Sequence, residues 1–357
     1  MTLTITKNLA LNNTYIDFIR YAIHQDMPVP EGADKIDWAD YLDFCYRQGV
    51  VGLVFDGLER SELRIPQMTL LEWIGAAESI KQQNKVLNKR TVQIFKFFQD
   101  KGLRCAVLKG QANGVMYPNP ELRSPGDIDI WVDSDRRELI NLVRNVTPDS
   151  HFDVYHIKFP LYQDVMVEVH YVPSWMIDKR KNRKLQLYIN RIKEEQFNNK
   201  ITLDRHVIAS LTNGFNLVYQ MLHMYGHFFE SRNNLKQLID YYYLLKQDIK
   251  ETDRLAAKRI IEELELTKYT SGVMWILREI LGADEQRLIV EPNERIGKAV
   301  WEGVEEYGDF SDNKLFRVIE QIVGNFKVFR LFPTTVLYSP IHFLWHQLWK
   351  VKMSFSL

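Results

Sequence analysis

Two aspartates stand one residue apart inside an apolar run, in the stretch RSPGDIDIWV at residues 123–132. Ile128 and Ile130 alternate with Asp127 and Asp129, which is the period-2 pattern of a β-strand with one buried face. The two carboxylates would leave the same face of that strand about 7 Å apart. Like charges held this close repel one another unless a cation lies between them. The stretch therefore predicts a rigid strand that presents a metal site.

A second stretch, VMVEVH at residues 165–170, repeats the pattern with Glu168 among valines. It predicts another strand with an acidic side chain opposite an apolar face. If the two strands are neighbours, Glu168 converges with Asp127 and Asp129. Such oxygen ligands suit Mg²⁺ or Mn²⁺, which normally also bind substrate phosphates. The alternative, open at this point, is that Asp127 is a turn residue and Asp129 an exposed strand residue.

A glycine turn supplies candidate phosphate ligands. The apolar run at 103–108 predicts a buried strand, and Lys109 and Gly110 then lead into a short helix predicted over 111–117. A glycine at a strand-to-helix turn lets backbone N–H groups approach phosphate oxygens, and a helix N-terminus favours an anion. Lys109 adds a positive charge, and Gln111 adds a side-chain hydrogen-bond donor.

Arg123 lies between the glycine turn and the aspartate pair. A guanidinium can hold a phosphate through two parallel hydrogen bonds, so Arg123 is a further candidate phosphate ligand. The alternative is a surface arginine that pairs with Glu121 or with a backbone carbonyl.

The spacing of the apolar residues divides the chain into three regions. Residues 1–85 have helical spacing, and a long helix is predicted over 68–100. Residues 86–200 contain the predicted strands. Residues 201–357 return to helical spacing, beginning with a helix over 204–230. The predicted fold class is α+β, with a small mixed β-sheet that has helices on one side and is flanked by two helical regions.

These motifs resemble those of an uncharacterised bacterial nucleotidyltransferase family within the DNA polymerase beta-like nucleotidyltransferase superfamily. The resemblance rests on LKG, YPNPELRSPGDIDIWV and VEVHY, which lie within residues 103–172, and less specifically on NLVYQMLHMYGHFF and LKQLIDYYYLL. The superfamily pattern is a glycine-led turn, a D-h-D strand and a third acid on a later strand. It corresponds here to Gly110, Asp127–Ile128–Asp129 and Glu168.

The resemblance implies a nucleotidyltransferase core that transfers a nucleoside monophosphate from an NTP to an acceptor hydroxyl, with release of pyrophosphate. Asp127 and Asp129 would hold one Mg²⁺ on the triphosphate, and a second ion would be shared with Glu168, which would deprotonate the acceptor. The acceptor can be a small molecule, a protein or an RNA, and the NTP preference is open. Gln111 stands where the wider superfamily usually has serine or glycine.

Four further polar residues are candidates for contact with substrate or with the metal ligands. His170 lies on the acidic face of its strand, and the alternative for it is a hydrogen-bonded core histidine. His223 and His227 lie four apart on a predicted helix and share a face. The glutamate of the HExxH zinc signature is absent, because Met224 follows His223. We expect these two histidines, with Asp240 of the next helix, to pack near the mouth of the site.

Charge and cysteine content restrict the partners and the compartment. Lys plus Arg equals Asp plus Glu at 46 each, so no overall field favours nucleic acid or a membrane surface. Two cysteines cannot form a disulfide framework and fit a reducing cytoplasm. No run of 18 apolar residues occurs, so no transmembrane helix is predicted. We expect a cytoplasmic protein, and the sequence leaves its oligomeric state open.

Two local segments are basic. KRKNRK at 179–184 is expected to be a solvated loop, with the guidance of RNA or of a polyphosphate tail as the alternative. Residues 314–357 carry six Lys/Arg against one acid, together with several aromatic residues. This composition fits a helical pair packed on the core or, alternatively, a membrane surface or a partner groove.

Two other functions stay open. The first is a catalytically inactive or antitoxin-like member that uses the fold as a binding module, and the complete acidic triad argues against it. The second is a metal-dependent phosphohydrolase. It is disfavoured because such sites generally collect several histidines with their acids, and only His170 is near in pattern.

Overall fold

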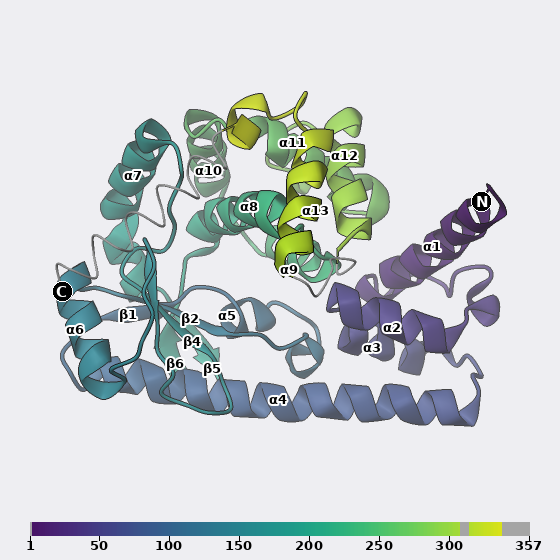
Figure 1. Ribbon diagram of the computed structural model, residues 1–357. Coiled ribbons are helices and arrows are strands. Elements are labelled where there is room, and N and C mark those ends of the chain that lie inside the picture. Colours follow the sequence, from purple (N-terminus) through teal and green to yellow (C-terminus); the bar gives the residue numbers. More distant parts are fainter. Residues whose placement is uncertain (1, 308–313, 338–357) are drawn as a thin grey trace.

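Four short strands form the sheet that carries the predicted acids (Figure 1). The computed structural model describes residues 2–307 and 314–337. The strands are β1 (Cys105–Val107), β2 (Ile128–Val132), β3 (His156–Lys158) and β4 (Val167–His170), in the order β1-β2-β4-β3. β2 pairs antiparallel with β1 and parallel with β4, while β3 pairs antiparallel with β4. The predicted small mixed sheet in an α+β fold is therefore confirmed.

Apolar side chains fix the register between the two acidic strands. Ile130 of β2 and Val169 of β4 are partners, and both are fully buried. This register makes Asp129 the direct partner of Glu168. The two acidic strands are neighbours, which is the condition for their acids to converge. Asp127 lies immediately before β2 and not within it.

A single long helix, α4 (Gln67–Gln99), agrees with the helix predicted over 68–100. It runs along both the N-terminal helices and the sheet (Figure 1) and contacts β1 and β2. Gly102 follows its end at φ +73°, and the Leu103 N–H donates to the Phe98 carbonyl at 3.0 Å. The division of the chain at 85/86 stays a prediction, and that position lies inside α4.

The other helices surround this framework. They are α1 (Thr2–Ile23), α2 (Trp38–Gln48), α3 (Val51–Ser61), α5 (Gln111–Gly114), α6 (Arg136–Val146), α7 (Lys179–Asn198), α8 (Asn213–Glu230), α9 (Leu235–Leu245), α10 (Glu251–Glu263), α11 (Thr267–Trp275), α12 (Glu294–Glu305) and α13 (Lys314–Lys327). None of the helices in 2–307 and 314–337 is long and apolar enough to span a membrane. A helical pair packed on the core was predicted over 314–357. The part of it beyond residue 337 lies outside the described residues.

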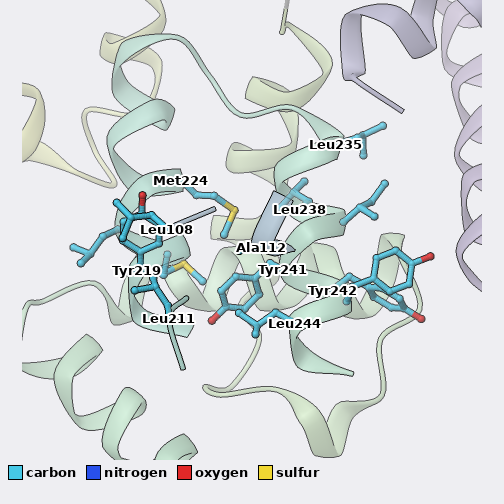
Figure 2. Packing of buried hydrophobic residues seen from close by; sticks show 14 of the residues in the cluster. Leu108, Ala112, Leu211, Tyr219, Met224, Leu235, Leu238, Tyr241, Tyr242 and Leu244 are labelled. Atoms are coloured by element: carbon cyan, nitrogen blue, oxygen red, sulfur yellow. The ribbon is translucent and has the colours of Figure 1, made fainter. Parts of the chain in front are cut away.

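Helices α8 and α9 pack against each other. Figure 2 shows Met224 of α8 among buried side chains of α9, including Leu238 and Tyr241. The Tyr241 hydroxyl donates to the Leu217 carbonyl at 3.1 Å. Helix α9 also contacts α5, so the C-terminal helices are joined to the segment that follows β1.

A β-hairpin replaces the beginning of the helix predicted over 204–230. Strands β5 (Lys200–Leu203) and β6 (His206–Ala209) pair antiparallel, and α8 begins only at Asn213. The hairpin turns through Asp204 and Arg205, both at positive φ. The prediction was wrong because neither residue is glycine, so the usual sequence signal of a tight hairpin is missing.

The basic run at 179–184 is also not a loop. It forms the first turns of α7, capped by the Asp178 side chain, which accepts from the Arg180 and Lys181 N–H groups. The side chains of Arg180 and Lys181 pair with Glu265 at 3.0 and 2.8 Å. The run was mistaken for a loop because its apolar periodicity begins only at the following residues.

A close helix contact gives a first test of the fold. A Cβ added at Gly52 of α3 would lie 2.1 Å from the carbonyl oxygen of Leu122, whereas one added at Gly75 of α4 would meet no atom within 4 Å. We expect Gly52→Ala to lower the free energy of unfolding by about 1–3 kcal/mol through overpacking. Gly75→Ala, the control, should raise it by about 0.5–1 kcal/mol. Urea unfolding measures both, and equal stability of the two variants would contradict the packing described.

Candidate active site

The pairing of β2 with β4 brings three ligand-bearing side chains together. One ligand atom each from Asp129, Glu168 and His170 lies within 4.8 Å of the others. Asp129 is 1% exposed and Glu168 is partly buried. The two carboxylates are held on rigid strands, because the alternate residues of both strands lie in the core. The predicted exposed position of Asp129, which was the alternative without a metal, is wrong.

Lys109 places its ammonium group between the two aspartates. Its Nζ lies 3.1 Å from Asp129 Oδ2 and 3.8 Å from Asp127 Oδ1. Lys109 reaches this position because the Leu108 N–H donates to the Asp129 carbonyl at 3.0 Å and so extends the pairing of β1 with β2. Asp127 is thus close to Asp129 through Lys109, although it is not one of the three residues whose ligand atoms cluster. The cation predicted between the aspartates is here a lysine.

The charges of this cluster shift the pKa values of its members in opposite directions. Burial alone would raise the pKa of Asp129, but Lys109 and His170 hold it well below its usual range. Burial and the charge of Asp129 raise the pKa of Glu168. Burial would lower the pKa of Lys109, yet the two aspartates raise it. Asp129 is therefore a fixed negative charge, while Glu168 is the better proton acceptor.

Two histidines support these acids. His170 Nε2 lies 3.0 Å from Asp129 Oδ1. His156 of β3 lies beside it, with ring centroids 5.4 Å apart and its Nε2 3.6 Å from Glu168 Oε1. Burial lowers the pKa of His156 to about 3, so this ring is neutral at pH 7. His156 was not among the predicted site residues, since a strand of three residues is too short to show alternation.

The glycine turn has part of the predicted form. Gly110 has φ +61°, and a Cβ added there would lie 3.1 Å from the Asp127 carbonyl oxygen, so glycine permits a close approach to the acidic segment. The helix that follows, α5, has four residues, which is shorter than predicted. The Gln111 side chain is buried and bonds to Asn88 and, at 3.5 Å, to Asn84 of α4. Its amide therefore anchors the turn to α4.

Arg123 is committed to an internal ion pair. Its Nε and Nη2 donate to Asp240 Oδ1 and Oδ2 at 2.8 and 2.7 Å. Tyr117 and Asn113 also donate to this carboxylate, at 2.7 and 3.3 Å. Because Arg123 is 4% exposed, the alternative of a surface arginine paired with Glu121 is wrong. Asp240, expected beside the two histidines of α8, instead fixes the segment before β2.

His223 and His227 of α8 lie close enough to Lys109 and Asp129 for those two charges to affect their pKa values. The rings of His223 and His227 are 4.4 Å apart, and Tyr219 stacks on His223 at 6.3 Å. Burial and the positive charge of Lys109 lower the pKa of both, that of His227 to about 4. A Cβ added at Gly226, on the same helix, would meet no atom within 4 Å.

Most of the chain matches a known protein family. Residues 34–282 match a protein family described as uncharacterised nucleotidyltransferase. The chain belongs to this family. No curated protein matches the chain. Among solved structures, an antigenic nucleotidyltransferase-like protein from Paracoccidioides brasiliensis is similar at 13% identity and a TM-score of 0.33, over 62% of this chain and 97% of that chain.

The donor set of this family member suits a divalent cation. The clustered groups are two carboxylates and one imidazole, and nucleotidyltransferases generally use divalent metals. His170 points Nε2 at Asp129, so it orients that carboxylate in the way that imidazoles commonly support metal ligands. The residues present therefore fit a metal ion.

Proposed function

We propose that the chain transfers a nucleoside monophosphate from an NTP to an acceptor hydroxyl and releases pyrophosphate. The observation that carries this proposal is the parallel pairing of Asp129 with Glu168, which holds two carboxylates beside Lys109 on adjacent strands. Phosphoryl transfer needs positioning and charge neutralisation more than covalent catalysis. A rigid acidic pair next to a lysine and a glycine turn supplies both.

Asp127, Asp129 and Glu168 would hold Mg²⁺ or Mn²⁺. When bound, such an ion neutralises the negative charge that gathers on the phosphate oxygens. Asp127 is the most exposed of the three, at 38% of its side chain, so it faces arriving substrate. His170 keeps Asp129 in one orientation.

The remaining chemistry belongs to protein side chains. Glu168 would accept the proton of the acceptor hydroxyl, since its raised pKa makes it a stronger base than Asp129. The acceptor oxygen then bonds to the α-phosphorus, the bond from that phosphorus to the bridging oxygen breaks, and pyrophosphate leaves. Lys109 would move from the aspartates to the phosphate oxygens, and Gly110 would let backbone N–H groups approach them.

A non-catalytic binding module is the second candidate, because one observation favours it. Lys109 occupies the space between the aspartates, and an ammonium that stays there would compete with a metal ion. The same fold would then bind a partner or a nucleotide without transferring it. The two functions differ in whether the nucleoside monophosphate is transferred from the bound nucleotide to an acceptor.

Labelled nucleotides separate these possibilities. The protein is incubated with Mg²⁺ or Mn²⁺, with each NTP labelled at either the α- or the γ-phosphate, and with small-molecule, protein and RNA fractions as acceptors. We expect α-label in one acceptor fraction, γ-label in pyrophosphate, and no reaction with excess chelator. Transfer of γ-label, or release of single phosphates, would contradict the proposal. Metal-dependent NTP binding without transfer in any fraction would favour the binding module.

A further inference from the structure

Lys236 holds a second ammonium beside the acidic segment. It lies in the first turn of α9, and its Nζ donates to the Pro125 carbonyl at 3.1 Å. A Cβ added at Gly126 would lie 3.3 Å from this Nζ, and one added at Gly49 would lie 3.3 Å from its methylene carbons. The methylene carbons of Lys236 therefore pack against the C-terminal end of α2, and its ammonium lies beside Gly126, the residue before Asp127.

The surroundings of this ammonium are unfavourable for a positive charge. No carboxylate of the described part of the chain lies within 4.0 Å of Lys236 Nζ, and the neighbouring Asp240 is already taken by Arg123. Burial, with the nearby charge of Arg123, lowers the pKa of Lys236 to about 8. The first turn of a helix also disfavours a cation, because the macrodipole is positive there. Within the described residues, the ammonium donates one hydrogen bond, to the Pro125 carbonyl, although it carries three N–H donors.

An anion would relieve this arrangement. The loop at Gly126 is exposed, so the ammonium can be reached from solvent over a residue without a side chain. Lys109 lies 3.8 Å from the carboxylate of Asp127, the residue that follows Gly126. Two lysines thus lie beside consecutive residues of the segment just before β2, and a chain of phosphates can contact both.

We propose that Lys236 binds the terminal phosphates of the NTP, the part that leaves as pyrophosphate. This inference rests on the proposed function and adds a residue from the C-terminal helices to its site. In the bound state the Nζ exchanges a carbonyl for phosphate oxygens, which form stronger, charge-assisted hydrogen bonds. The lysine would then also join α9 to the substrate.

A structural role predicts the opposite behaviour. If Lys236 serves only to tether the Pro125 carbonyl, its removal should destabilise the fold and affect phosphate binding only through that loss. If it is a phosphate ligand, Lys236→Met removes a buried charge without a carboxylate partner, so the free protein should be at least as stable as the original. If Lys236 is a phosphate ligand, the variant therefore loses phosphate affinity without losing stability. If its role is only structural, the variant loses both together.

The probe is inorganic tripolyphosphate with Mg²⁺, measured by calorimetry on the full chain, with urea unfolding in parallel. We expect Lys236→Met to weaken tripolyphosphate binding about 10- to 100-fold with no loss of stability, and Lys236→Arg to restore part of the affinity. Lys246→Met is the control, because Lys246 is an exposed lysine at the other end of the same helix. It should change neither quantity.

The outcomes distinguish this inference from the proposed function. Unchanged affinity in Lys236→Met, equal losses of affinity and stability without rescue by arginine, or no tripolyphosphate binding by the original protein would overturn the inference. Nucleotidyl transfer by the original protein, together with unchanged affinity in Lys236→Met, would overturn the inference alone. Tripolyphosphate binding that depends on Lys236, without any nucleotidyl transfer, would support the inference and contradict the proposed function.

Discussion

Replacing Asp129 with asparagine is expected to slow nucleotidyl transfer about 10³-fold, the effect of removing one preorganised charge-stabilising group from an active site. Asparagine keeps the shape of the side chain and an oxygen that can face His170 Nε2. It removes the negative charge that faces Lys109 at 3.1 Å. The variant should therefore lose metal affinity and the fixed charge that orients the cluster, while strand β2 remains in place. Initial rates and titration with Mn²⁺ measure the two effects.

Asp133→Asn provides a matched control at the other end of β2. Asp133 also forms ion pairs, with Arg104 and Lys193, but it is more exposed than Asp129 and lies just after the end of β2, four residues beyond the partner of Glu168. This variant should retain transfer and Mn²⁺ binding. An Asp129→Asn protein that keeps more than a tenth of the original rate would show that the acidic pair is not the site of reaction.

Breaking the pair of Arg123 with Asp240 should have the largest effect on stability. Removing one partner of a buried ion pair leaves an uncompensated charge and typically costs about 3–5 kcal/mol. Arg123→Met leaves the Asp240 carboxylate with Tyr117 and Asn113 as its donors among the residues that the structure describes. The segment before β2 would also lose its anchor, so transfer should fall together with the free energy of unfolding.

A double replacement tests this explanation. Exchanging both partners for apolar residues, as in Arg123→Met with Asp240→Leu, removes both charges and should recover much of the stability lost in Arg123→Met. Urea unfolding of the single and double variants gives the coupling energy. If the double variant is less stable than the original protein by the sum of the two single losses, the two residues do not act as a pair.

The sequence contains the local half of this site. Alternation around Asp129 and Glu168 predicts two half-buried strands, and the structure pairs them directly. The glycine at 110 was found because a strand-to-helix turn commonly needs one. The resemblance to nucleotidyltransferases also came from these motifs, and the family match confirms it. These features depend on neighbours within a few residues.

The other half depends on contacts between distant segments. Arg123 and Asp240 are 117 positions apart, and a single arginine shows no pattern that separates a phosphate ligand from an internal ion pair. Lys236 was missed for the same reason, since it reads as one more polar residue of an amphipathic helix. His156 was missed because a strand of three residues gives too few alternations. The hairpin at 200–209 was missed because its turn, Asp204-Arg205, contains no glycine.

The continuity of α4 has a consequence for how much of the chain the reaction needs. Thirty-three residues of helix extend about 50 Å, from the N-terminal helices to the sheet. Near its middle, the Asn84 side chain donates to the carbonyls of Glu121 and Arg123 at 2.7 Å each. Asp240 of α9 holds the same segment through its ion pair with Arg123. The loop that leads to the acids is thus clamped by residues outside 86–200, so that segment excised alone would contain the acids without the supports that aim them.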